Sequence, residues 1–258
     1  MKKRTITLIC LLIGLLILLL GLVAAWGLLK NGLYYLNASS PAAQTIRAYA
    51  KEQGIPFYKY PCDLIELLDT NPETEEFVLA YPRRQELAVD VTGYSRDTVP
   101  LFLQWDPMWG YETYGSSFLA VTGCGPTCLA MAGYYLTGSP EMNPKAVAEF
   151  AEKNGYYAPG SGSSWTLISQ GAQQLGLKAT ELPLVEGKIN RALDAGHPVI
   201  LALGKGDFTS SGHYIVLTAR TQEGYTVNDP NSPIRSSQPW TYAQLEGQIR
   251  NIWEMEVE

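Results

Sequence analysis

Two cysteines stand one helical turn apart at the start of an apolar segment. The stretch VTGCGPTCLAM, residues 121–131, contains Cys124 and Cys128, with Pro126 between them. A proline is favoured in the first turn of a helix, so we predict that a helix begins near Cys124. Unpaired amides and the helix dipole stabilise a thiolate there, whereas a cysteine one turn further along usually packs as a small buried side chain. Cys124 is therefore the predicted nucleophile.

A nucleophilic cysteine needs a general base, and the chain has two histidines. His213, in SGHYIVL, follows a glycine at the start of an apolar strand, which places its ring at the end of that strand. His197, in AGHPVI, falls in a turn before a proline, where a surface position is expected. Histidine changes its charge near neutral pH, and His213 is the predicted base.

A third residue should hold the imidazole in one orientation. Asp229, in VNDPNS, ends a short strand that is predicted to form a hairpin with the strand of His213. The two side chains can then lie on neighbouring strand ends, where the carboxylate accepts a hydrogen bond from the ring. Asn228 and Asn231 are the alternatives for this role.

A metal site formed by Cys124, Cys128 and His213 is a weaker interpretation of the same residues. Structural zinc sites use four ligands, commonly supplied as two closely spaced pairs. This set has one pair, spaced Cys-x-x-x-Cys, and it lacks a fourth ligand. We predict no metal and no other cofactor.

The elements that hold these residues follow the order of an α+β domain. A strand is predicted over residues 99–105, and helices are predicted over 125–136, 144–153, 165–175 and 186–195. Three short β-rich runs follow, PVILALG, HYIVLTAR and YTVND. Helices thus come first and an antiparallel sheet follows, with the last two strands joined as a hairpin across TQEG.

Four motifs together resemble a known family. QWDPMWG, GCGPTCLAM, SGHYIVL and VNDPNS, in this order, are similar to the C39-like branch of the papain-fold cysteine peptidases, from about Pro72 to the C-terminus. The resemblance implies a papain-like fold, in which the nucleophile helix packs on an antiparallel sheet. It also implies a catalytic triad of Cys124, His213 and Asp229 that cleaves a peptide or protein, cell-wall peptides included.

The resemblance further implies a glutamine, upstream of the nucleophile, that helps to bind the oxyanion. Gln104 is the one glutamine in the matching upstream motif. Bacteriocin-processing members carry this glutamine a few residues before the cysteine, whereas a longer segment intervenes here. Gln104 is thus a candidate oxyanion donor, and the alternative is a glutamine that is satisfied by backbone groups.

The N-terminus predicts a membrane anchor. Lys2, Lys3 and Arg4 precede an apolar run over residues 6–29, which is roughly long enough to cross a bilayer as a helix. The positive-inside rule then keeps the N-terminus in the cytoplasm and places the rest of the chain outside. The alternative is a signal peptide cleaved at the small residues 23–25, which exports the domain as well.

The chain is accordingly predicted to have three parts. These are a membrane anchor over residues 1–30, a helical preface over 31–98 and the peptidase domain over 99–258. In the preface, Ser40-Pro41 and Asn71-Pro72 each place an N-cap residue before a proline. The formal net charge is -6 and no basic stripe is present, which excludes nucleic acid as a partner.

Two other functions fit the same residues. A peptidoglycan amidase or an acyl transferase would use the same Cys-His-Asp geometry on a different amide. A non-catalytic peptide-binding module would retain the groove of a papain-like fold, and its Cys124 would be unreactive. Peptide-bond cleavage is the predicted function.

Overall fold

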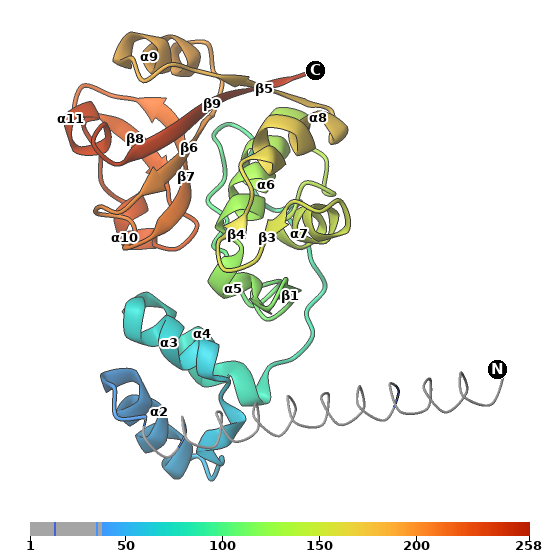
Figure 1. The fold of residues 1–258 in the computed structure, drawn as a ribbon, viewed down its shortest axis with the longest axis vertical. Helices are drawn as coiled ribbons and strands as arrows, with labels where there is room; N and C mark the ends of the chain where they lie inside the picture. Colours follow the sequence, from blue (N-terminus) through green and yellow to red (C-terminus); the bar gives the residue numbers. More distant parts are fainter. Residues whose placement is uncertain (1–12, 14–34, 36–37) are drawn as a thin grey trace, which may run out of the picture. The chain divides into compact units, whose positions relative to one another are not determined.

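The computed structural model describes Ile13, Tyr35 and residues 38–258. The predicted anchor over residues 6–29 lies outside the described residues except for Ile13, and no helix in the described part is long and apolar enough to span a bilayer. The chain divides into a smaller unit, Met1–Thr70, and a larger unit, Asn71–Glu258 (Figure 1). Residues 71–98, which the sequence analysis assigns to the preface, therefore pack with the larger unit.

The described part of the smaller unit contains two helices with a short turn between them. They are α2 (Pro41–Glu52) and α3 (Cys62–Thr70), and η1 (Phe57–Lys59) lies between them. Ser40 caps α2 by accepting a hydrogen bond from the amide of Ala43, as predicted for a serine before a proline. The apolar faces of both helices are buried, and the amide of Ala42 donates to Asp69 Oδ1 at 2.9 Å.

The larger unit begins with the second predicted cap. Asn71 accepts a hydrogen bond from the amide of Glu73 at the start of η2 (Pro72–Thr74), which leads into α4 (Glu75–Ala80) and η3 (Tyr81–Arg83). Asn71 Nδ2 also donates to the backbone oxygen of Asn231 at 2.6 Å. Glu73 accepts from the hydroxyl of Ser232 and from the amide of Ile234. The start of the unit is thus bonded to residues 231–234, which follow β8 (Tyr225–Asn228).

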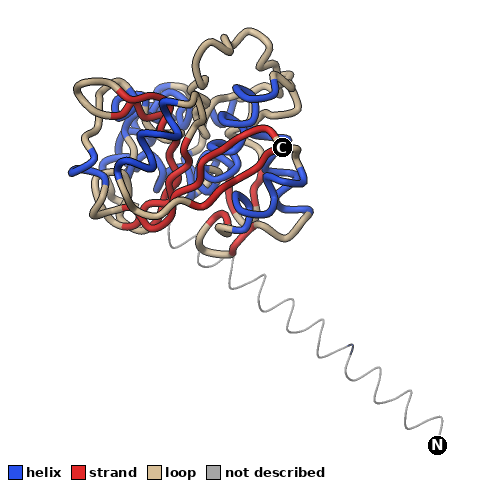
Figure 2. The backbone as a smooth tube through the Cα atoms, turned by 90° about the horizontal axis from the view of Figure 1, so that it is seen from above, coloured by secondary structure: helices blue, strands red, loops and turns tan. Residues whose placement is uncertain are grey.

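A five-stranded antiparallel sheet forms the centre of the larger unit (Figure 2). Its strand order is β5-β9-β6-β7-β8. The strands are β5 (Leu177–Glu181), β6 (Val199–Gly204), β7 (Gly212–Arg220), β8 (Tyr225–Asn228) and β9 (Ile249–Val257). The β7-β8 hairpin is the one predicted across TQEG, and its Gly224 has a φ of +139°, a conformation that L side chains rarely adopt.

Helices cover both faces of this sheet. On one face lie α6 (Cys124–Thr137), α7 (Pro144–Lys153), η4 (Leu167–Gly171) and α8 (Ala172–Gln174), and on the other lie α9 (Glu186–Asp194) and α11 (Tyr242–Leu245). Successive residues of β6 alternate between two apolar cores: Ile200 joins the core around α6, and Leu201 joins the core around α9. Burial on both faces explains why this strand reads as an unbroken apolar run.

The remaining elements of the larger unit are short. Two small hairpins, β1 (Thr113–Tyr114) with β2 (Ser117–Phe118) and β3 (Tyr157–Ala158) with β4 (Gly162–Ser163), lie among the helices. The helical turns α5 (Leu119–Thr122) and α10 (Pro233–Ser236) precede α6 and follow β8, respectively.

The predicted strand over residues 99–105 is wrong. This segment has no strand partner, and it is held by non-local bonds instead. Asn228 Nδ2 donates to the backbone oxygens of Val99 and Pro100, and the amide of Gln104 donates to the oxygen of Pro230. Pro100 has no amide hydrogen for a strand ladder, so the segment lies beside the end of β8 without pairing with it.

Candidate active site

The predicted nucleophile lies at the beginning of the buried helix. α6 starts at Cys124, as the sequence analysis predicts, and the thiol residue itself is only partly buried. The preceding Gly123 provides no side-chain cap for the first turn. A Cβ at Gly125 would come within 2.7 Å of Ser163, so glycine allows the start of α6 to pack closely against β4.

Cys128 occupies the opposite kind of environment. It lies in the same helix one turn later, has no exposed surface and belongs to the apolar core. Burial raises the pKa of the Cys128 thiol well above its usual value, and the nearby Cys124 and Asp229 charges raise it further. This thiol is therefore protonated and inaccessible in the folded protein.

His213 and Asp229 meet where the ends of β7 and β8 adjoin. The antiparallel register pairs Val216 with Asn228, so the residue after β8 lies near the start of β7. His213 Nε2 is 2.7 Å from Asp229 Oδ1. The other ring nitrogen is not used by Asp229, and the Cys124 side chain lies close enough to His213 to raise the pKa of the imidazole. The structure thus brings the three predicted residues together.

Charge interactions set the ionisation of this pair. Burial lowers the pKa of His213, but the charge and hydrogen bond of Asp229 and the Cys124 side chain outweigh burial and raise this pKa to about 10. Burial alone would raise the pKa of Asp229, but His213 and Arg235 outweigh it and hold this pKa below its usual range. Both groups are therefore charged at neutral pH.

Asp229 has a further partner, Arg235, which the sequence motifs did not predict. Arg235 Nε lies 2.5 Å from Asp229 Oδ2, while the amide of Asn231 donates to Oδ1 at 2.8 Å. The carboxylate has no exposed surface. The sequence does contain a signal for the turn that carries Arg235, the Ser232-Pro233 pair. A serine before a proline predicts the start of a helical turn, and this turn returns the chain towards Asp229.

The two alternative residues for the third position have side chains that are hydrogen-bonded to other groups than the imidazole. The side-chain amide of Asn228 donates to backbone oxygens of residues 99 and 100. The side-chain oxygen of Asn231 accepts from Asn71 Nδ2 at 3.0 Å. Both asparagines hold backbone segments around the site, and Asp229 is the residue bonded to His213.

His197 lies at the other end of the sheet. It precedes β6, and the antiparallel register places the start of β6 opposite Leu217 and its end opposite His213. The His197 ring is hydrogen-bonded to Glu254 Oε1 at 2.7 Å and remains partly exposed. It is thus separated from Cys124 and paired with a different acid.

Gln104 connects the two backbone segments that carry the nucleophile and the acid. Its side-chain Nε2 donates to the oxygen of Ala120 at 2.7 Å, and its amide donates to the oxygen of Pro230 at 2.7 Å. The side chain is buried, and its Oε1 has no hydrogen-bond partner among the described residues. Nε2 carries a second hydrogen, so bonding to backbone and donation to an oxyanion are compatible. The role of Gln104 as an oxyanion donor stays a prediction.

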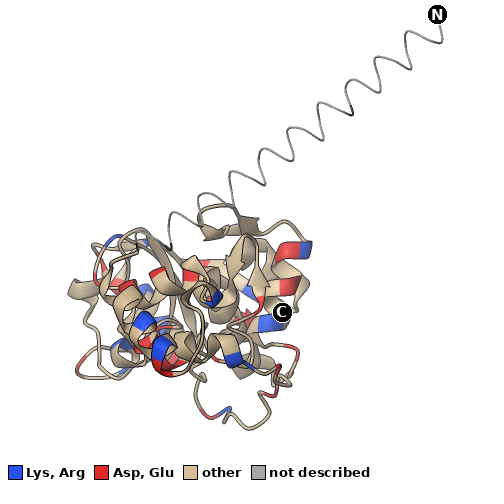
Figure 3. Ribbon diagram, turned by 90° about the horizontal axis from the view of Figure 1, so that it is seen from below, with Lys and Arg blue, Asp and Glu red and all other residues tan. Residues whose placement is uncertain are grey.

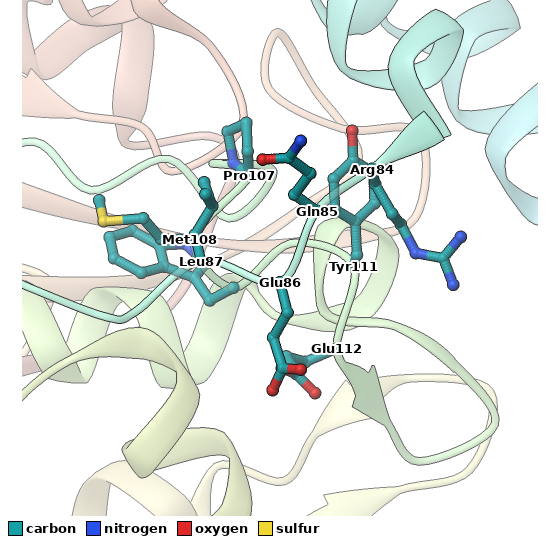
Figure 4. Close-up of a pocket in the computed structure, with 9 residues that line it drawn as sticks. Arg84, Gln85, Glu86, Leu87, Pro107, Met108, Tyr111 and Glu112 are labelled. Atoms are coloured by element: carbon teal, nitrogen blue, oxygen red, sulfur yellow. The ribbon is translucent and has the colours of Figure 1, made fainter. Parts of the chain in front are cut away.

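Other parts of the larger unit are separate from these residues. A groove of about 450 Å³ is lined by residues 84–87, 107–109 and 111–112, and none of the four predicted site residues lines it (Figure 4).

Lys and Arg positions are interspersed with Asp and Glu positions along the described chain (Figure 3). Among the described residues, no group of three or more His, Cys, Asp or Glu could hold a metal ion.

Comparisons with known proteins agree with the motif resemblance. The model of the Peptidase_C39 like family matches residues 96–257. One similar solved structure is the peptidase domain of Streptococcus ComA, a bifunctional ABC transporter involved in a quorum sensing pathway. It is 19% identical, with coverage of 53% of this chain and 93% of that chain and a TM-score of 0.43.

Another similar structure is a Bacillus anthracis protein assigned to the C39-like peptidases. It is 17% identical, with coverage of 66% of this chain and 98% of that chain and a TM-score of 0.36. A search of the curated proteins found no match.

Proposed function

The chain belongs to the Peptidase_C39 like family, and from this membership we propose that it is a cysteine peptidase that hydrolyses peptide bonds through Cys124, His213 and Asp229. One observation carries the choice of residues. His213 lies between a completely buried carboxylate at 2.7 Å and the thiol at the start of a buried helix. This is the nucleophile, base and orienting acid that amide cleavage by a thiol requires.

In the proposed reaction, Cys124 acts as a thiolate beside the protonated His213, and this thiolate attacks the carbonyl carbon of the scissile amide. The tetrahedral intermediate collapses as His213 gives its proton to the departing amine, which leaves an acyl thioester on Cys124. Water then attacks this thioester while His213 takes its proton, and the thiolate is expelled as the acid product leaves. Asp229 orients the ring and stabilises each imidazolium that forms.

Gln104 is the proposed side-chain donor to the oxyanion. Its Nε2 is fixed by the bond to Ala120, four residues before the nucleophile, and one hydrogen of this group remains for the developing charge. Donors that are already held in place stabilise an oxyanion without reorganising during the reaction.

The test is to incubate the full-length chain with a pool of unstructured peptides and, in parallel, with purified peptidoglycan. We expect cleavage of peptide bonds with the addition of one water, identified by mass spectrometry, and we expect no product from Cys124→Ala. Product from peptidoglycan alone would favour the amidase instead. Acyl transfer to an added amine, without hydrolysis, would favour the transferase, and peptide binding without any product would favour the non-catalytic module.

We also propose that residues 6–29 anchor the chain in the cell membrane and that the peptidase domain lies outside the cytoplasm. The support is the positive cluster at residues 2–4 ahead of the apolar run. Protease added to intact cells should digest the domain and leave a cytoplasmic marker protein intact. Protection of the domain until lysis would contradict this topology, and loss of residues 1–25 from the mature protein would identify a cleaved signal peptide instead.

A further inference from the structure

We propose that Arg235 is a positioning residue for the reaction: its guanidinium holds one oxygen of Asp229, so that the other oxygen stays on His213. This proposal rests on the proposed function. The reaction itself assigns no part to Arg235, which contacts neither the thiol nor the imidazole through any bond found in the structure.

The donors around the Asp229 carboxylate are divided between its two oxygens. Oδ1 accepts from His213 Nε2 at 2.7 Å and from the amide of Asn231 at 2.8 Å, whereas the side-chain donor on Oδ2 is Arg235 Nε at 2.5 Å. A carboxylate can rotate about its terminal bond, and partial rotation would move the bonded oxygen out of line with His213 Nε2. A cationic donor on Oδ2 opposes this rotation, because charge-assisted hydrogen bonds are strong and directional.

The positive charge beside Asp229 changes during the reaction. Asp229 has no exposed surface, so it depends on neighbouring cations to remain ionised. His213 is neutral after it has protonated the departing amine, and at that stage it no longer supplies a positive charge. The groups that face Asp229 are His213 from β7, Arg235 from α10 and the neutral Cys128 thiol from α6. Arg235 therefore supplies the positive charge that persists in every step.

Arg235 is itself held in place by its backbone. Its amide donates to Ser232 Oγ at 3.0 Å, and its backbone oxygen accepts from Trp240 Nε1 at 2.9 Å. Its guanidinium carbon lies 5.8 Å from the centre of the Phe208 ring. The amide of the preceding residue, Ile234, donates to Glu73. A side chain built on such a fixed turn can orient its partner.

The test compares Arg235→Gln and Arg235→Lys with the matched control Arg220→Gln. Like Arg235, Arg220 is hydrogen-bonded to a carboxylate. It donates through two nitrogens, at 2.9 and 2.8 Å, and its partner is the exposed Asp194. For each full-length variant we would measure kcat and KM for a cleaved peptide against pH, and the rate at which iodoacetamide alkylates Cys124 against pH. Alkylation reports the thiolate and needs no peptide substrate.

For Arg235→Gln we expect the acidic limb of both pH profiles to move up by about one pH unit. A nearby cation lowers the pKa of a carboxyl group by about 1 to 3 units, so loss of the guanidinium should raise the pKa of Asp229. We expect a shift at the lower end of this range, because the guanidinium is partly exposed and therefore screened. We expect kcat to fall by about tenfold to a hundredfold from misplacement of the imidazole, with KM nearly unchanged. Arg235→Lys should restore the acidic limb, and Arg220→Gln should match the wild type.

An acidic limb that stays in place in a folded Arg235→Gln protein would overturn the proposal, whatever the loss of kcat. If Arg235→Gln does not fold, a limb that moves up in Arg235→Lys, which retains the charge, would overturn it equally. A wild-type protein that neither cleaves peptides nor alkylates at Cys124 would overturn the proposed function, and this inference with it. A reactive wild type with an unmoved limb in Arg235→Gln overturns the inference alone.

Discussion

Replacing Cys124 with alanine is expected to lower kcat/KM for peptide cleavage by about 10⁵-fold or more, because no other described group can form the acyl intermediate at this position. The thiol is only partly buried at the end of α6, so the protein should remain folded with a thermal unfolding midpoint near that of the wild type. Initial rates on a peptide identified in the cleavage screen measure the first effect, and a thermal unfolding scan measures the second.

Cys128→Ala is the matched control, since it removes the same atom one turn along the same helix. This variant should lose about 1 kcal/mol or more of unfolding free energy from the cavity in the core, while keeping most of its activity. Brief iodoacetamide treatment of the native protein at pH 6 should modify Cys124 and leave Cys128 intact, because burial keeps the Cys128 thiol protonated. Modification of Cys128 with Cys124 untouched would reverse the assignment.

Replacing His213 with alanine is expected to lower kcat/KM by about 10³ to 10⁴-fold, since both activation of the thiol and protonation of the leaving amine are lost. His197→Ala is the matched control: its ring bonds Glu254 at the other end of the sheet, so most of the activity should remain. Initial rates across a pH series, after circular dichroism has shown that both variants fold, make the comparison.

Equal losses in the two folded histidine variants would contradict the assignment of His213 as the base. Added imidazole offers a second measurement. It should partly restore cleavage in His213→Ala, because the substitution leaves space beside Asp229 for a diffusible base, and it should leave His197→Ala unchanged.

The sequence predicted the elements whose signals are local. A proline in the first turn and an apolar continuation placed the start of α6 at Cys124, and turn residues between β-rich runs placed the β7-β8 hairpin. That hairpin in turn predicted that His213 and Asp229 could meet, which the structure shows at 2.7 Å. This contact was predictable because the two residues lie close together in the sequence, at the strand ends of one hairpin.

The features that were missed depend on tertiary contacts that a local sequence pattern does not encode. Residues 99–105 have the composition of a strand, yet their backbone is bonded by the side chain of Asn228 and by Pro230, which lie far along the chain. The predicted helix over 165–175 is instead a π-helical turn followed by α8. Arg235 has no periodic pattern that would point it at Asp229, since α10 is a single turn. No local propensity encodes such partners.

The bonds from Asn71 and Glu73 to residues 231–234 bear on where this chain can be cut or joined to another chain. They join the loop of Asp229 and Arg235 to a segment that ends more than twenty residues before the family match begins at residue 96. A recombination event that transplanted residues 96–257 alone would carry the triad but leave Ser232 and Ile234 without their acidic partner. The shortest fragment that keeps these bonds therefore starts at Asn71, and this residue sets the boundary for any truncated or chimeric form of the larger unit.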